Sequence, residues 1–414
     1  MDLWRKNLYI LWGTQFLAML GMNLVVPFLP FFIRELGIAN SDELSRFTGI
    51  AFSGPFLLSL IFTPIWGMLG DRYGRKAMVV RALFGLGLSQ ALIGLSQNVW
   101  HLILFRVLQG AISGFIPAAL ALVSTNSPKE RTGYALGVLQ SSSAAGMVMG
   151  PLVGGILADL IGYRSIFFVT AGLCFAGTFV VMSQVKEGQD ANPQARRFTV
   201  LDNYKLMFTD RRLRVVGILF VVGQMSVLMA EPLFALFIEG FTTGTAYLST
   251  LAGGIFSIAG LFMVVSAPWW GKRNDQTGYR SNLAVAFGVT AICYAGHLIV
   301  SDLIQLSLLR SFLGFARGGV LPALYALTST YSPPERRGGM MAIASSLTVL
   351  GNLIGPILGG LSAGHFGILA PFAVNSIVLF LAGIFVWTSL DERIGESKST
   401  TRVDNAVQLL ERVE

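Results

Sequence analysis

The chain is 414 residues long, 53% of them hydrophobic and only 13% charged, with a formal net charge of +8. A soluble protein of this length could not bury so much apolar surface, whereas a bilayer accepts apolar side chains on the outside of every helix. The basic residues lie in short clusters between apolar runs, so membrane topology explains the positive charge better than nucleic-acid binding. The composition therefore predicts a polytopic membrane protein and argues against a nucleic-acid partner.

Apolar runs follow one another along the whole chain. A spanning helix needs roughly 20 mostly apolar residues. The runs that meet this length are 8–33, 47–70, 77–97, 100–125, 133–158 and 164–184, and then 213–239, 246–270, 281–300, 302–329, 338–362 and 369–389. We predict an all-α membrane protein with twelve transmembrane helices in two six-helix bundles. The predicted parts are an N-terminal bundle (1–184), a cytoplasmic linker (185–212), a C-terminal bundle (213–390) and a cytoplasmic tail (391–414).

The basic residues also predict the orientation. Placing the N-terminus inside puts most Lys and Arg residues on the cytoplasmic side, as the positive-inside preference requires. The first run, 8–33, is too long for the apolar region of a signal peptide and is followed by another span. We therefore expect a multi-pass protein of the bacterial cytoplasmic (inner) membrane, with both termini in the cytoplasm.

The two halves repeat one another at a nearly constant offset. Arg106 and Gly110 recur as Arg310 and Gly314. Longer matches pair Thr63-Pro64-Ile65-Trp66-Gly67 with Ala267-Pro268-Trp269-Trp270-Gly271, and Gly146, Gly150, Pro151, Gly154 and Gly155 with Gly351, Gly355, Pro356, Gly359 and Gly360. Parallel six-span repeats are one architecture of secondary transporters, and their solute site lies near mid-membrane between the halves.

Three motifs resemble those of the major facilitator superfamily, and the resemblance covers almost the whole chain. They are Gly67-x3-Asp71-Arg72-x-Gly74-Arg75-Lys76 between spans two and three, Arg106-x2-Gln109-Gly110 in span four, and Gly146-x3-Gly150-Pro151-x2-Gly154-Gly155 in span five. The last is similar to the motif of the drug:proton antiporter-1 branch. The resemblance implies the major facilitator fold and proton-coupled efflux of amphiphilic drugs, or other small organic solutes, by alternating access.

The loop motif is predicted to form a cytoplasmic gate. A carboxylate at the end of span two can meet a positive helix end or a guanidinium of a neighbouring helix only while the cytoplasmic sides of the halves are closed. The alternative is a polar turn whose basic residues serve topology alone. The gating residues are predicted to be Gly67, Asp71, Arg72, Gly74 and Arg75, with Asp275 as a weaker copy.

The glycines of span five share one face at four-residue spacing, so we expect tight packing against a helix of the other half. Pro151 weakens the span locally. Together these residues would form a close-packed hinge that limits proton leak. Plain helix packing is the alternative, because span eleven has the same pattern: Gly146, Gly150, Pro151, Gly154 and Gly155 match its glycines and proline.

Charged residues inside spans are costly and usually line a cavity. Glu231 is the only carboxylate deep in any predicted span, and it immediately precedes Pro232. We predict that Glu231 exchanges protons while the cavity changes sides; static pairing with an arginine is the alternative. Arg106 resembles the fourth-span arginine that the superfamily associates with proton coupling.

Two further arginines lie in span ten. Arg310 and Arg317 are two helical turns apart, so both can face one cavity. Three intramembrane arginines against one glutamate favour anionic or zwitterionic solutes over simple cations. Polar residues predicted to contact the solute, unless they only join helices, are Asn23, Gln15, Gln224 and Gln140.

No phosphate-binding loop, metal-ligand cluster or catalytic-triad spacing is visible in the sequence. We therefore expect a transporter rather than an enzyme, without cofactor or metal, driven by an ion gradient. Its expected partners are a small-molecule substrate, protons and the lipid bilayer, and it is expected to act as a monomer. Two alternatives are a dedicated carrier of an organic anion such as a siderophore, and a lipid flippase or membrane sensor on the same scaffold.

Overall fold

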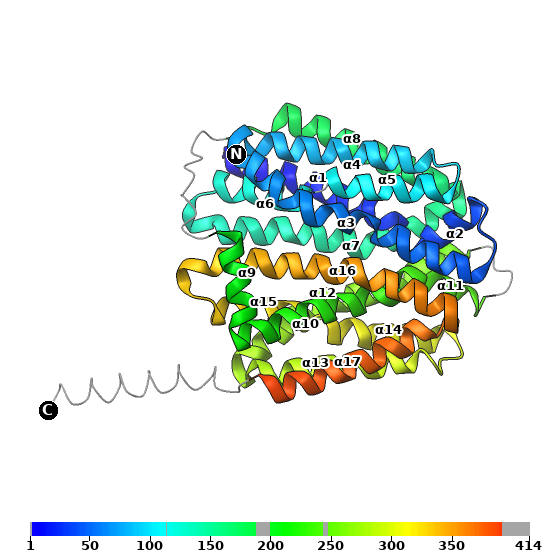
Figure 1. Cartoon of the computed structure of the whole chain (residues 1–414). Helices are drawn as coiled ribbons and strands as arrows, with labels where there is room; N and C mark the ends of the chain where they lie inside the picture. The colour runs from blue at the N-terminus through cyan, green and yellow to red at the C-terminus, as the bar shows by residue number, and fades with distance from the viewer. Residues whose placement is uncertain (1, 113, 188–198, 243–246, 391–414) are drawn as a thin grey trace.

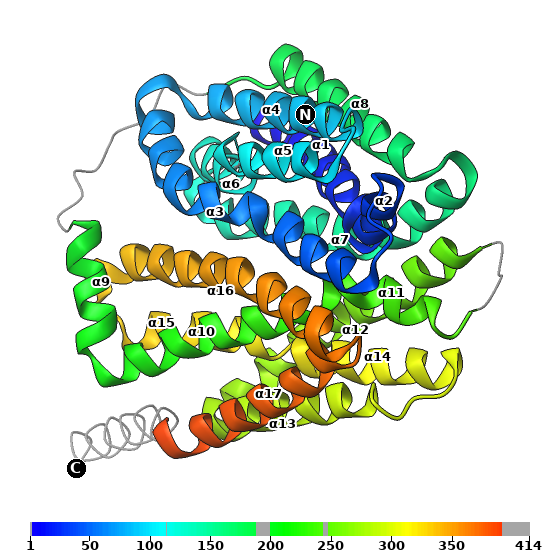
Figure 2. The same cartoon turned by 45° about the vertical axis from the view of Figure 1, so that its right-hand side comes forward.

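The computed structural model describes residues 2–112, 114–187, 199–242 and 247–390, and the regular elements of this part of the chain are all helices. Most helices run side by side along one direction (Figure 1). In the turned view the helices that precede the linker form one layer and those that follow it form a second layer (Figure 2). Residues 188–198 of the predicted linker and the predicted tail, 391–414, lie outside the described residues.

The helices follow the predicted runs closely. The N-terminal half contains α1 (Leu3–Val25), η1 (Val26–Phe28), α2 (Leu29–Glu35), α3 (Ser41–Tyr73), α4 (Arg75–Gly94), α5 (Val99–Ile112), α6 (Phe115–Asn126), η2 (Lys129–Arg131), α7 (Thr132–Ile161) and α8 (Tyr163–Gln184). The C-terminal half contains α10 (Arg211–Ala230), η3 (Glu231–Leu233), α11 (Phe234–Glu239), α12 (Leu248–Thr277), α13 (Tyr279–Gly296), α14 (Leu303–Arg317), α15 (Val320–Tyr331), η4 (Pro334–Arg336), α16 (Arg337–Phe366) and α17 (Ala370–Ser389).

Ten helical stretches among the described residues are long and apolar enough to cross a membrane. The predicted spans 281–300 and 302–329 form helices α13, α14 and α15, yet they are not among these ten. α14 carries two arginines, Arg310 and Arg317, and ends before α15 begins. Helix length and composition therefore establish a multi-pass membrane protein, but not the count of twelve.

Four predicted spans are broken, and they are the first, fourth, seventh and tenth in chain order. η1 interrupts the first between α1 and α2, and η3 interrupts the seventh between α10 and α11. Pro27 and Pro232 are the second residues of these short helices, and proline cannot donate the hydrogen bond that would continue an α-helix. The fourth and tenth spans divide into α5 and α6, and into α14 and α15. Discontinuous helices of this kind form the solute sites of secondary transporters.

The sequence repeat also governs where long helices end. Gly74 ends α3 with φ +95°, and Gly278 ends α12 with φ +87°. Gly162 and Gly367 end α7 and α16 with φ +80° and +86°. These angles lie in the region that side chains disfavour, so glycine stops each helix sharply. Equivalent spans of the two halves thus end at equivalent positions.

The predicted linker contains a helix, α9 (Val200–Thr209), that the sequence analysis did not anticipate. The Thr199 hydroxyl accepts a hydrogen bond from the Asp202 backbone N–H at 3.2 Å, and the Asp202 carboxylate accepts one from the Thr199 backbone N–H at 3.0 Å. This capping box starts the helix. α9 packs against α10 and α16 and lies crosswise to the long helices (Figures 1 and 2).

Candidate functional site

An ion pair joins two of the helix breaks. Arg317, the last residue of α14, donates from Nη1 to Glu231 Oε1 at 2.6 Å. Glu231 is the first residue of η3, and the two side chains are only 11% and 13% exposed. Each charge offsets the desolvation of the other, and removing one partner of such a buried pair leaves the second charge uncompensated. The pair therefore fixes the break of the seventh span against the break of the tenth in this conformation.

Arg310 lies deeper, inside the C-terminal half, and is only 2% exposed. Its Cζ is 4.1 Å from the ring centroid of Phe234 and 5.2 Å from that of Phe256, so aromatic faces surround the guanidinium. Arg310 Nε and Nη2, Tyr294 OH and His297 Nε2 are buried without hydrogen-bond partners among the described residues. We predicted that Arg310 faces one cavity with Arg317; in this conformation it is enclosed by aromatic rings instead.

Arg106 lies on α5 where this helix packs against α3. A Cβ atom added at Gly54 of α3 would approach Arg106 Cβ to 3.2 Å, so the two helices are in close contact there. Arg106 Nε is buried and has no hydrogen-bond partner among the described residues. The structure does not bring Arg106 into an ion pair with Glu231, which pairs with Arg317.

The four polar residues predicted to contact the solute differ in how deeply they are buried. Gln15 is fully buried, and its Nε2 donates to Leu139 O at 3.2 Å and to Ser143 Oγ at 2.6 Å. Gln15 therefore joins α1 to α7 in this conformation, the alternative to solute contact that we gave for these polar residues. Asn23 is half-buried and donates to Met19 O at 2.7 Å, Gln224 is half-buried, and Gln140 is exposed.

The glycines of α7 pack differently from the prediction. A Cβ atom added at Gly146, Gly150 or Gly154 would collide with α1, which belongs to the same half. Gly155 does face the other half, against the backbone of Ser249 at the start of α12, and the Pro151 carbonyl lies against Gly253 of α12. The expectation that all these glycines face the other half is therefore corrected, because helix periodicity turns Gly155 away from the row formed by the other three.

The second half repeats this arrangement. Added Cβ atoms at Gly351, Gly355 and Gly359 of α16 would collide with α10, whereas one at Gly360 would meet the backbone of Ser45 and Gly49 on α3. Each half therefore binds its first span tightly to its fifth, and the last glycine of the motif lies at the contact with the other half.

Polar contacts gather where the halves meet near α2 and α11. Arg34 donates from Nη1 and Nη2 to the two carboxylate oxygens of Glu239, at 2.7 and 2.8 Å. Asp159, at the end of α7, accepts from the backbone N–H groups of Ser249 and Thr250, at 3.2 and 2.8 Å. Such charge-assisted bonds are stronger than neutral ones. Together they connect the halves at this end of the molecule.

Sequence reasoning did not single out Arg34, Glu239 or Asp159. Arg34 and Glu239 are 205 residues apart, the register of the internal repeat, so they are equivalent positions of opposite charge. Asp159 follows the glycine motif by one helical turn. The repeat register and the position of Asp159 after the glycine motif can be seen in the sequence. The contacts of Arg34 with Glu239 and of Asp159 with Ser249 depend on how the halves pack.

The predicted gating loop contacts its own half in this conformation. Arg75 Nη1 donates to Ala121 O at 2.8 Å, and the backbone N–H groups of Arg75 and Lys76 donate to Glu187 at 2.6 and 3.1 Å. Gly67 and Arg72 are exposed, and Asp275 accepts from Tyr279 OH at 3.2 Å. The side chain of Asp71 lies outside the described part of the chain.

Glu187, three residues after the end of α8, was not predicted to have a structural role. Its carboxylate caps α4, whose N-cap residue Gly74 has no side chain to do so. We expect Glu187→Ala to lower the free energy of unfolding by about 0.5–2 kcal/mol, the usual effect of losing a helix cap. Thermal unfolding of the purified protein measures this, with Glu130→Ala at an exposed position as the control. An unchanged melting temperature for Glu187→Ala would show that the cap contributes nothing.

Comparisons with known proteins agree with this architecture. The family described as Major Facilitator Superfamily matches residues 11–306 and 298–411. The Multidrug resistance protein MdtG of Proteus mirabilis (strain HI4320) is 35% identical over 394 residues, covering 93% of this chain and 96% of the relative. The protein of the same name from Escherichia coli O17:K52:H18 is 32% identical over 393 residues, covering 94% and 96%.

A solved structure supports the same fold. It is a bacterial homolog of the human lysosomal transporter Spinster, in an inward-facing and occupied conformation. It superposes with a TM-score of 0.79 at 14% identity, over 94% of this chain and 97% of that one. The resemblance seen in the three sequence motifs is confirmed over nearly the whole chain, which belongs to the Major Facilitator Superfamily.

Proposed function

We propose that the protein is a proton-coupled exporter of amphiphilic organic solutes that works by alternating access. Family membership makes it a secondary transporter of small organic solutes rather than an enzyme. The relatives that it resembles over more than nine-tenths of its length are called multidrug resistance proteins. Their names support export of drug-like compounds.

The ion pair between Glu231 and Arg317 carries this proposal. Protonation of Glu231 would remove the negative charge and leave Arg317 without its partner in the interior of the protein. An unpaired buried charge is costly, so the protonated protein would favour a conformation in which the two helix breaks separate and Arg317 reaches water or an anionic group. Proton binding and the arrangement of spans seven and ten would thereby be coupled.

We further propose that α13 and α14–α15 complete a set of twelve spans, and that both termini face the cytoplasm of a bacterial inner membrane. In that orientation, the contacts of Arg34 and Asp159 close the periplasmic side, so this conformation would open toward the cytoplasm. The bundles 1–184 and 213–390 would rock against each other. The loop residues around Asp71 would hold the cytoplasmic side closed in the opposite state.

A second candidate is a dedicated carrier of organic anions. Arg106 and Arg310 are intramembrane guanidinium groups that form no ion pair among the described residues, while Glu231 forms its ion pair with Arg317. Such an excess of positive charge favours anions. Competition separates the two candidates, because a multidrug exporter would bind many unrelated compounds and a dedicated carrier a single chemical class.

The test is proton movement in energised everted vesicles that contain the protein. Zwitterionic, cationic and anionic amphiphiles are added in turn, and vesicles without the protein are the control. Proton release that depends on both the protein and the solute would support antiport and reveal the charge preference. Solute binding without any proton response would contradict it, and would point to a uniporter, a flippase or a sensor.

A further inference from the structure

A histidine at the end of α16 contacts the other half of the protein. His365 lies in the last turn of α16, and its Nε2 atom is 3.4 Å from Nη2 of Arg46 on α3. The same Nη2 donates to the carbonyl oxygen of Gly364 at 3.3 Å. α3 begins and α16 ends on the side of the molecule where α2 and α11 lie (Figure 2). Arg46 and His365 therefore join the halves at the same end as the contacts of Arg34 and Asp159.

The hydrogen bonds of His365 determine which of its ring nitrogens carries a hydrogen. Nδ1 lies 2.8 Å from the carbonyl oxygen of Leu361. A carbonyl oxygen only accepts, so Nδ1 carries the hydrogen and Nε2 of the neutral ring has a free lone pair. The guanidinium of Arg46 only donates. Arg46 can therefore donate to His365 only while the ring is neutral, because a proton on Nε2 would bring two N–H groups and two positive charges together.

The backbone around this contact is closely packed. A Cβ atom added at Gly364 would lie 2.8 Å from the Asp42 carbonyl oxygen and 2.9 Å from Cγ of Arg46. One turn earlier on α16, a Cβ atom added at Gly360 would meet the backbone of Ser45. The aliphatic part of Arg46 is thus held against the end of α16, and its guanidinium stays close to the ring while the halves are closed.

Few other charged groups of the described helices lie near this contact. Asp42 and Glu43 are exposed in the first turn of α3. η3 also packs against α16 and carries Glu231, which pairs with Arg317. α15 and α17 contain no Asp, Glu, Lys, Arg or His, and α9, η4 and the basic first turn of α10 lie at the opposite end of the molecule (Figure 1).

The charges across the contact therefore have opposite effects on a protonated ring. Arg46, which donates to the neutral ring, would repel it. Asp42, one helical turn before Arg46, is the acidic group that could reduce this repulsion. Because Asp42 is exposed, solvent screens its charge more than that of the half-buried Arg46. Repulsion by Arg46 is expected to dominate.

We propose that the contact of Arg46 with His365 is a proton-sensitive latch between the halves. Histidine changes charge between about pH 5 and 8. Protonation of His365 removes the hydrogen bond and places two cations side by side, so the closed arrangement loses stability relative to the open one. In the proposed orientation this end faces the periplasm, so acid on that side favours opening toward it and admits protons to Glu231. This role in transport rests on the proposed function, whereas the latch itself does not.

The experiment measures closure at two pH values in the purified full-length protein. Ser249 is fully buried at the other crossing of the halves, so a maleimide labels Ser249→Cys when this end opens. The labelling rates of Ser249→Cys and Ser249→Cys/His365→Gln are compared at about pH 8 and about pH 6, on either side of the usual histidine midpoint. The ratio of the two rates cancels the effect of pH on the thiol and on the neighbouring Asp159.

At the higher pH we expect the two proteins to be labelled at the same rate, because a neutral His365 and a glutamine can both accept from Arg46. At the lower pH the protein with His365 should be labelled about two- to fivefold faster, the size usual for a charge interaction at an exposed site. Adding Arg46→Gln to both proteins should abolish this difference, because the repelling cation is then absent.

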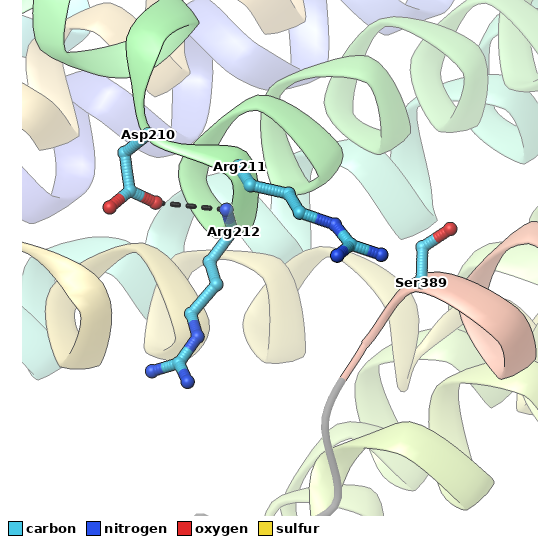
Figure 3. A pocket seen from close by; sticks show the side chains of 4 residues that line it. All are labelled: Asp210, Arg211, Arg212 and Ser389. Atoms are coloured by element: carbon cyan, nitrogen blue, oxygen red, sulfur yellow. Dashed lines mark hydrogen bonds between the residues drawn. The ribbon is translucent and has the colours of Figure 1, made fainter.

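Two substitutions away from the latch are the controls. His101→Gln changes an exposed histidine on α5 whose ring contact is within its own helix. Arg211→Gln changes an exposed arginine at the opposite end of the molecule. Figure 3 shows its surroundings, a hollow of the C-terminal half that Asp210, Arg212 and Ser389 also line. Both variants should be labelled like the parent protein at both pH values.

Two outcomes overturn the proposal. One is equal labelling with and without His365 at the lower pH. The other is a difference that persists in the Arg46→Gln background, which would assign the response to Asp42 or another group. His365 is exposed, so His365→Gln should fold, and His365→Asn repeats the comparison if it does not. Neither result depends on solute export, which the vesicle experiment tests separately.

Discussion

Replacing Glu231 by glutamine is expected to abolish solute-dependent proton release, at least tenfold below the wild-type rate, while solute binding persists. Glutamine is nearly isosteric with glutamate but cannot take up and release a proton at physiological pH. The replacement also leaves the buried charge of Arg317 without a counter-charge, although the amide oxygen can still accept a hydrogen bond from Arg317. Breaking a buried ion pair in this way costs about 3–5 kcal/mol of stability, so a lower melting temperature is expected as well.

A matched variant separates coupling from stability. Glu231→Gln/Arg317→Gln removes both charges, so it should recover most of the lost stability and remain uncoupled. Everted vesicles report the proton movement, and thermal unfolding of the same purified proteins reports the stability. Solute-dependent proton release at the wild-type rate in Glu231→Gln would eliminate this carboxylate from the coupling path.

Replacing Gly155 by leucine is expected to prevent the halves from closing at the end that carries α2 and α11, and to reduce transport at least tenfold. An added Cβ atom would already collide with the backbone of Ser249, and backbone atoms cannot rotate away as a side chain can. Overpacking a tight contact typically costs about 1–3 kcal/mol, which is enough to shift a two-state equilibrium by one or two orders of magnitude.

The same helix provides the control. Gly137 of α7 has no atoms within 4 Å of an added Cβ, so Gly137→Leu should transport like the wild type. The substitution Ser249→Cys reports on closure, because Ser249 is fully buried here and the two native cysteines are buried as well. A membrane-impermeant maleimide should label the introduced thiol faster when Ser249→Cys is combined with Gly155→Leu than when it is made alone. Equal labelling in both backgrounds would mean that Gly155 does not control this contact.

Much of the fold was predictable because long apolar runs and a repeated register need no knowledge of packing. The predicted run 133–158 became α7, and 338–362 became α16. α9 was not predicted, because its start depends on a local capping box at Thr199 and its position on contacts with α10 and α16. Span ten remained outside the set of clearly apolar helices because α14 carries two arginines and ends before α15 begins. Span nine remained outside it although α13 is unbroken, because α13 has only 18 residues and its first turn contains Arg280 and Asn282.

The candidate site was predictable only in part. Intramembrane charge drew attention to Glu231 and Arg317 one by one, but their pairing depends on how spans seven and ten face each other. For Gln15 the residue type was misleading. A polar side chain within a span suits solute binding, yet Gln15 is fully buried and hydrogen-bonds between α1 and α7. The glycine row of α7 has the right spacing for close packing, but spacing alone does not say which helix it meets.

Gly155 and Gly360 place backbone directly against backbone at two crossings of the halves, α7 with α12 and α16 with α3. Two rigid bodies whose backbones approach most closely at two places turn most easily about the line through those places. At these two glycines the nearest atoms of the partner helix are backbone atoms, so a turn there does not have to move a side chain out of the way. We therefore expect the halves to rock about an axis through these two glycines rather than to slide past each other.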